Sequence, residues 1–297
     1  MGSERRKALS RYRYFLPLIF VVFCISRPLT IAGETETAKE AVFHREHLNV
    51  LVALIVFCAF FFYFLFRSRK GRALYLRKIP GIRAIEEAVG RATEMGKPVL
   101  FVPGIDDIDE IQTLAGIAIL SHVARIVARY DSSIIVPTRK SIVMTVCEET
   151  VKESFTAAGR PDAYRGDNIR YLSDDQFAYT VGVDGIMLRE KPVANIYMGA
   201  FYAESLILSE TGFSSGAIQV AGTASLSQLP FFIAACDYTL IAEEFYAASA
   251  YLSKDPKVLS SIKASDYFKI VTILVLVAGI ILVNVKPEWV EMFKFWF

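Results

Sequence analysis

Long apolar runs are the first feature of the hydrophobic pattern. The clearest, at 48–66, carries no charge, and another covers 267–285 with a single lysine near its start. A helix of about 20 apolar residues is long enough to cross the hydrocarbon core of a bilayer. A weaker run at 14–32 is interrupted by two prolines and an arginine. The pattern predicts three transmembrane helices, two N-terminal and one C-terminal.

The run at 14–32 has a second interpretation. Basic residues precede it, an apolar stretch covers Phe15–Ile25, and Thr30-Ile31-Ala32 has the small residues of a cleavage site. This is the order of elements in a secretory signal peptide. The segment is therefore either a retained transmembrane helix or a signal peptide that is removed.

Charged residues are unevenly distributed around these runs. Lys and Arg are concentrated before 14–32 and after 48–66, whereas the segment between the two runs is rich in Glu. The positive-inside rule then places 67–266 on the cytoplasmic side of the membrane and 286–297 outside. The aromatic residues of 286–297 are typical of a membrane interface, either as an amphipathic end or as a protein contact there.

Between the second and third runs, short apolar segments alternate with helical patterns. Helical periodicity covers Ile108–Tyr130 and Ser141–Ala158. Continuously apolar segments of this length are typical of strands buried on both faces of a parallel sheet. We therefore expect 67–266 to form one α/β domain with a Rossmann-like, doubly wound, mainly parallel sheet. The expected strands are Val99–Val102, Ser133–Val136, Asn168–Leu172, Val193–Met198, Ala217–Val220 and Tyr238–Ile241.

Composition agrees with this division of the chain. The 297 residues are 54% hydrophobic with a mean hydropathy of +0.38, which is too apolar for an ordinary soluble domain. The net charge is only +2, from 33 Lys and Arg against 31 Asp and Glu, so charge gives no reason to expect a nucleic-acid partner. Four cysteines are too few for a disulfide scaffold.

Candidate ligand-binding residues follow the predicted strands, because ligands of open parallel sheets bind beyond the carboxyl ends of the strands. Cations and hydroxyls at a helix start suit a phosphate or carboxylate, and clustered carboxylates suit a metal or a ribose. Helix capping, solvated charge and tight packing are alternative explanations of the same residues. The candidates are Gly104, Asp106 and Asp107 after the first strand, Thr138, Arg139 and Lys140 after the second, Gly222 and Thr223 after the fifth, and Glu243 after the sixth.

Several familiar signatures are missing from the sequence. There is no Walker A motif, no G-x-G-x-x-G after the first strand and no zinc-ligand spacing. No Ser-His-Asp or Cys-His set can be assembled. We therefore name no catalytic residue, no metal site and no cofactor, and this scarcity disfavours an enzyme.

Four sequence blocks occur in one order. They are Gly104–Gly116, Ala158–Tyr164, Gln219–Ser225 and Ile241–Ser253. Together they resemble a family of bacterial membrane proteins, the domain of unknown function DUF6754, over about residues 80–285. The resemblance implies a bacterial multi-pass protein of the cytoplasmic membrane with one cytosolic α/β domain. It brings no activity and no functional residues.

Two functions from different classes follow. The first is a structural or assembly subunit of a homo-oligomeric membrane complex, with the bilayer, further copies and other subunits as partners. Anchoring at both ends raises the local concentration, and Leu114 and Ile117 lie outside the main apolar stripe of their helix. Such residues either contact a neighbouring subunit or are buried between helices of one domain.

The second function is a sensor or enzyme that binds a nucleotide or another anionic small molecule at the strand ends, by analogy with the fold. A pore or transport component is a third hypothesis. It is disfavoured because the apolar runs contain almost no polar residue to line a pathway.

Overall fold

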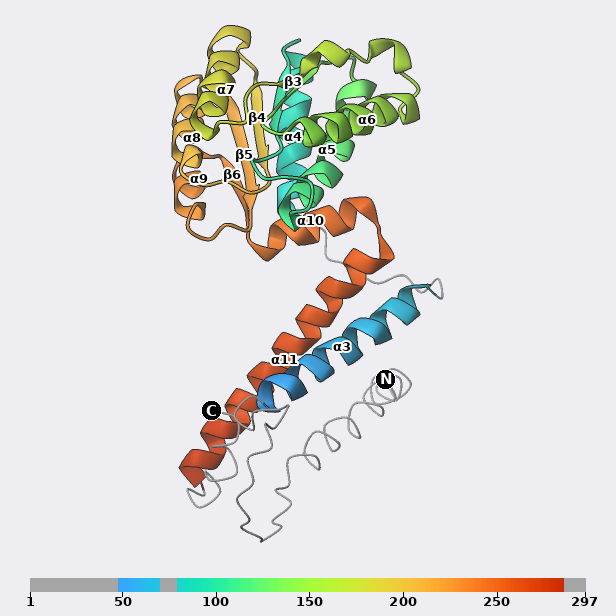
Figure 1. Ribbon diagram of the computed structural model, residues 1–297, viewed down its shortest axis with the longest axis vertical. Coiled ribbons are helices and arrows are strands. Elements are labelled where there is room, and N and C mark those ends of the chain that lie inside the picture. Colours follow the sequence, from blue (N-terminus) through green and yellow to red (C-terminus); the bar gives the residue numbers. More distant parts are fainter. Residues whose placement is uncertain (1–47, 70–78, 286–297) are drawn as a thin grey trace, which may run out of the picture. The chain divides into compact units, whose positions relative to one another are not determined.

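The computed structural model describes residues 48–69 and 79–285 (Figure 1). The chain divides into two compact units. One is the segment Phe64–Lys263, and the other combines the residues on either side of it. The expected helix at 14–32 and the aromatic tail at 286–297 lie outside the described residues.

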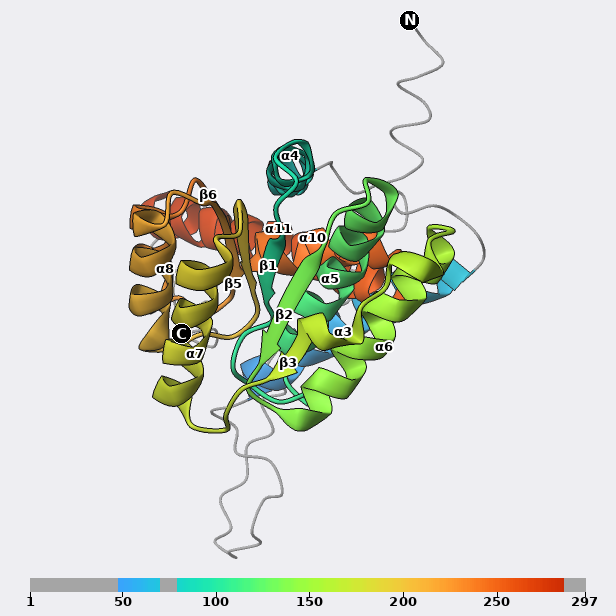
Figure 2. The same cartoon turned by 90° about the horizontal axis from the view of Figure 1, so that it is seen from above.

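A six-stranded sheet forms the centre of the larger unit. All neighbouring strands are parallel, in the order β3-β2-β1-β4-β5-β6 (Figure 2). The direction of strand progression therefore reverses between β1 and β4. The strands are β1 (Val99–Val102), β2 (Ile134–Thr138), β3 (Ile169–Tyr171), β4 (Ala194–Met198), β5 (Ile218–Thr223) and β6 (Tyr238–Ile241).

Helices cover both faces of the sheet, with α4, α5, α6 and α10 on one side and α7, α8 and α9 on the other (Figures 1 and 2). The prediction of an α/β domain with a parallel sheet is therefore confirmed. These helices are α4 (Pro80–Glu94), α5 (Ile111–Arg129), α6 (Ser141–Ala157), α7 (Gln176–Glu190), α8 (Glu204–Ser214), α9 (Leu229–Ala235) and α10 (Glu243–Ser253), and two 3-10 turns, η2 (Pro161–Ala163) and η3 (Gly166–Asn168), connect α6 to β3.

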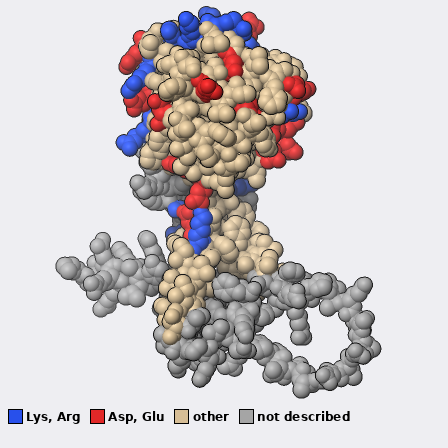
Figure 3. All heavy atoms as spheres, turned by 90° about the vertical axis from the view of Figure 1, so that its left-hand side faces the viewer, with Lys and Arg blue, Asp and Glu red and all other residues tan. Residues whose placement is uncertain are grey.

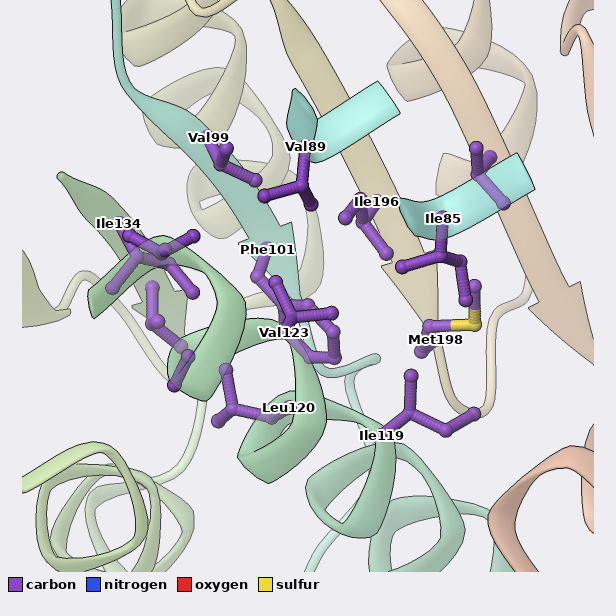
Figure 4. Close-up of a cluster of buried hydrophobic side chains, with 14 of the residues drawn as sticks. Ile85, Val89, Val99, Phe101, Ile119, Leu120, Val123, Ile134, Ile196 and Met198 are labelled. Carbon is purple, nitrogen blue, oxygen red and sulfur yellow. The ribbon is translucent and has the colours of Figure 1, made fainter. Parts of the chain in front are cut away.

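The sheet separates two hydrophobic cores. Side chains alternate across a strand, so Val99 and Phe101 of β1 pack toward α4 and α5, whereas Leu100 and Val102 pack toward α7 and α8. The first core is the larger, and Figure 4 shows its centre, where α4, α5 and three strands meet. All four β1 residues are buried, which explains why this strand is continuously apolar.

The apolar runs at 48–66 and 267–285 lie in the helices α3 (Leu48–Arg69) and α11 (Pro256–Val285). Among the described residues, three helices are long and apolar enough to cross a membrane: α3, α11 and α5. More than half of the α5 segment is buried, whereas only 11% of each of the other two is. In the smaller unit, α3 and α11 contact each other through an edge-to-face pair of Phe57 and Phe268, with ring centroids 5.7 Å apart.

The structure differs from the sequence prediction at several element ends. Thr138, Gly222 and Thr223 were expected in loops, but they are the last residues of strands. The helix α11 begins at Pro256, well before the predicted apolar run at 267–285, and continues without interruption to Val285. Ile117 is only 8% exposed and belongs to the first core, so it is not available to another subunit, whereas Leu114 is 50% exposed.

Candidate functional site

The predicted site residues lie at the carboxyl edge of the sheet, as expected for residues that follow or end parallel strands. Gly104, Asp106 and Asp107 form the loop between β1 and α5, and Arg139 and Lys140 connect β2 to α6. The structure shows what each side chain contacts there, and most of these contacts are with neighbouring loops.

The crevice between β1 and β4 is closed by the main chain. The amide of Ile105 donates a hydrogen bond to the carbonyl of Ala200, 3.0 Å away, so the loops after the two strands are joined. Gly104 has φ +84°, and a Cβ atom at this position would lie 2.6 Å from the same carbonyl oxygen. A Cβ atom on Gly199 would collide with the carbonyl of Pro103. Glycine is therefore required here for backbone contact within the chain.

Arg139 connects three strand-end loops. Its Nε donates to the carbonyl oxygen of Asp174 at 2.8 Å, and its Nη1 donates to the carbonyl oxygen of Ile105 at 3.1 Å. Lys140 forms an ion pair with the Asp174 carboxylate, with Nζ 3.6 Å from Oδ1. The two cations that were expected to hold an anion therefore connect β2 to the loops after β1 and β3.

The carboxylates after β1 also make contacts within the chain. Asp107 Oδ1 accepts a hydrogen bond from the amide of Ile108 at 2.7 Å, and Asp106 Oδ2 accepts one from the hydroxyl of Tyr202 at 3.1 Å. The Asp106 charge is the main reason why the pKa of Tyr202 is raised. Within 48–69 and 79–285, no group of three or more His, Cys, Asp or Glu side chains is placed to hold a metal ion.

The end of β5 is joined to the start of α5 by Gln112, which the sequence analysis did not select. Its Oε1 accepts hydrogen bonds from the Ala224 amide at 2.9 Å and from the Thr223 hydroxyl at 3.3 Å. Gly222 is buried, and a Cβ atom there would come within 2.7 Å of Met198 Sδ. Glu243 is exposed in the first turn of α10.

Glu204 and Gln176 form a buried polar contact that the sequence analysis also missed. Glu204 is fully buried in the first turn of α8, where its Oε1 accepts from the Tyr202 amide at 2.8 Å and its Oε2 accepts from Gln176 Nε2. A glutamate at a helix start was the only available signal, and it is the ordinary signal of helix capping.

A cavity of about 320 Å³ lies at the opposite, amino edge of the sheet. Arg160 supports one side of it through an ion pair with Asp131, whose Oδ1 is 2.8 Å from Nη2. None of the predicted site residues lines this cavity. Its polar lining includes Asp131, Ser133, Asp162, Tyr164, Arg165 and Asn168.

Comparison with protein families gives one match. The family model of a domain of unknown function (DUF6754) covers residues 38–294, which is most of the chain. The chain belongs to the DUF6754 family. The match extends the resemblance noted over 80–285 at both ends. No curated protein and no solved structure is similar enough to be matched to this chain.

The sequence blocks that indicated DUF6754 contain residues that pack elements together or connect them. In the first block, Gly116 lets α5 approach β4 closely, because a Cβ atom there would collide with the carbonyl of Met198. In the second, Arg160 pairs with Asp131 at the amino edge, and the Tyr164 ring packs edge-on against Phe155. The third block covers most of β5 and the two residues after it, and the fourth covers α10 and the two residues before it. In this DUF6754 member, these blocks account for packing and loop connection.

Proposed function

We propose that this chain is a structural or assembly subunit of a homo-oligomeric complex in a bacterial cytoplasmic membrane. Its anchors would be α3 and α11, which flank the α/β unit along the chain and are long and apolar enough to span a bilayer. The Lys and Arg residues that follow α3 favour a cytoplasmic position for the α/β unit.

The observation that carries this proposal is the closed crevice between β1 and β4. A ligand that entered between the loops after β1 and β4 would have to break the Ile105–Ala200 hydrogen bond and separate backbones that meet at Gly104 and Gly199. Arg139 donates hydrogen bonds to two carbonyl groups of neighbouring loops. Strand-end loops that contact one another in this way favour a scaffold over a binding domain.

Native mass spectrometry of the full chain in mild detergent tests the assembly role. The expected result is a defined oligomer that persists on dilution. A monomer at every working concentration would overturn the proposal.

Strand order supports a second candidate, a sensor or enzyme for a nucleotide or another anionic small molecule. The order β3-β2-β1-β4-β5-β6 is that of Rossmann-like, dinucleotide-binding sheets, and we propose that the fold is of this type. A thermal-shift screen of nucleotides, sugar phosphates and divalent metals tests this candidate. Stabilisation that grows with ligand concentration would favour it, and no stabilisation at millimolar concentrations would exclude it.

Thiol labelling in intact cells tests the proposed orientation. Met95 is 59% exposed at the end of α4, so a Met95→Cys variant without the native cysteines offers one accessible thiol. Native Cys147 is unsuitable because it is fully buried, which raises the pKa of its thiol to about 12. The cysteine at position 95 should react with a membrane-permeant maleimide only. Labelling by an impermeant maleimide would place the unit outside.

A further inference from the structure

The outer surface of α7, α8 and α9 is unusually apolar. Figure 3 shows this side of the molecule, where Lys, Arg, Asp and Glu lie mainly toward the margins and uncharged residues occupy most of the centre. We call this surface the α7–α9 face. Its large apolar side chains are each 38–71% exposed, and they are Phe177, Val181, Leu188, Leu206, Ile207, Phe213, Phe231 and Ile233.

The area of the α7–α9 face is larger than a monomer normally leaves in water. From their exposed fractions, these residues leave on the order of 800 Å² of surface in water, about the area that a standard protein interface buries on each partner. The opposite side of the sheet offers a contrast, because the helix α5 there is itself covered by α6 and α10. The α7–α9 face is therefore large enough to form one half of a stable interface.

The helix α7 gives the face a regular pattern. Phe177, Val181 and Leu188 are separated by four and seven residues, the spacing that places side chains along one stripe of a helix. The same helix buries Tyr179, Val183 and Met187 against the sheet. The outer stripe also carries Asp184, a half-buried acid with a hydrogen bond to Thr211 of α8, but its three apolar residues are each more than half exposed. A stripe with this spacing can pack against an identical stripe on an antiparallel helix.

We propose that the α7–α9 face is where two copies of this chain associate, with the α7 helices packed against each other across a two-fold axis. This inference rests on the proposed assembly function and names its interface. Two faces of this size would bury at most about 1,600 Å², within the range of stable dimers. A two-fold contact needs only one self-complementary surface, and a shared bilayer keeps the copies at high local concentration.

A charge on the α7 stripe tests this interface. Val181 is 69% exposed, so Val181→Glu should leave folding intact while placing two carboxylates close to the two-fold axis. Ile142 on α6, 56% exposed, gives the matched control Ile142→Glu on the opposite side of the sheet. We expect at least a tenfold weaker association of full-length Val181→Glu in detergent by native mass spectrometry, and no change for Ile142→Glu. Circular dichroism melting checks that both variants are folded.

Crosslinking provides a second readout that does not depend on affinity. In a chain without native cysteines, Val181→Cys should form dimers with a short bis-maleimide, and Ile142→Cys should not. If the wild-type chain is oligomeric but neither Val181 variant behaves as expected, the interface lies elsewhere and the assembly function stands. If the wild-type chain is monomeric, both proposals fail.

Discussion

Single residues fix how closely the strand-end loops approach each other, and Gly104 is the clearest case. Its φ of +84° is unfavourable for any side chain, and an added Cβ atom would lie 2.6 Å from the Ala200 carbonyl oxygen. We expect Gly104→Ala to lower the free energy of unfolding by roughly 3 kcal/mol, through backbone strain together with the steric clash. Urea denaturation of the purified chain would measure the change.

Gly90 provides the matched control for that substitution. It lies within α4, and no atom is within 4 Å of an added Cβ atom. Gly90→Ala should therefore raise the free energy of unfolding by about 0.5–1 kcal/mol, the usual gain for alanine within a helix. Equal effects at both positions would show that the β1 and β4 loops do not meet as described.

Asp184 is a half-buried acid on α7, between Val181 and Leu188. Desolvation raises its pKa from 3.8 to about 6, with a hydrogen bond to Thr211 opposing the shift. This raised pKa belongs to the folded state, so the folded chain holds the proton more tightly than the unfolded chain does. The contribution of Asp184 to the free energy of unfolding should therefore be greatest below pH 4 and should be lost as the pH rises through 6.

The substitution Asp184→Asn should remove this pH dependence. We expect the variant to be more stable than the wild type by about 1 kcal/mol at pH 8, a figure reduced for partial exposure, and equally stable near pH 4. Urea denaturation at the two pH values measures the difference. A variant that is less stable at pH 8 would mean that the carboxylate is well solvated or paired.

Among the elements, the loops that follow β1, β2 and β3 are connected in part by the Arg139 side chain. Arg139→Ala would remove hydrogen bonds to the carbonyls of Ile105 and Asp174, at a cost of about 2 kcal/mol. Hydrogen exchange should then become faster at 103–110 and 172–176, while the strands remain protected. Unchanged exchange in both loops would show that Arg139 is not what connects them.

The sequence predicts the existence of every strand of the sheet but not every end. The prediction is correct for β1 and β6, which are short and apolar. The predicted strands end too early at β2 and β5, because Pro137 and Gly222 are residues that are unusual inside strands. Their backbones nevertheless pair with β3 and β6, so tertiary pairing outweighs local preference.

The candidate residues lie at the carboxyl edge of the sheet, as the sequence predicted, but the sequence did not predict what they contact there. Spacing along the chain shows that residues follow parallel strands, and topology then brings them to one edge. It does not show that Ile105 will contact Ala200, because that contact depends on strand order. Gln112 and Glu204 were missed for the same reason, since their partners are set by packing between loops.

The whole α/β unit has the cores it needs to fold without the apolar anchors. Both hydrophobic cores lie within Phe64–Lys263. A fragment of residues 79–263 should therefore unfold in a single cooperative transition in urea. The transitions followed by circular dichroism and by tyrosine fluorescence should then coincide. Non-coincident transitions would mean that the anchors contribute to the core.

The burial of α5 has a consequence for mapping where each part of the chain lies. By hydropathy alone, this helix would be counted as a crossing, and everything after it would be assigned to the other compartment. However, β1 precedes α5, β2 follows it, and these two strands are hydrogen-bonded neighbours in one sheet. Reporter fusions placed just before and just after α5 must therefore report the same compartment, whichever compartment that is.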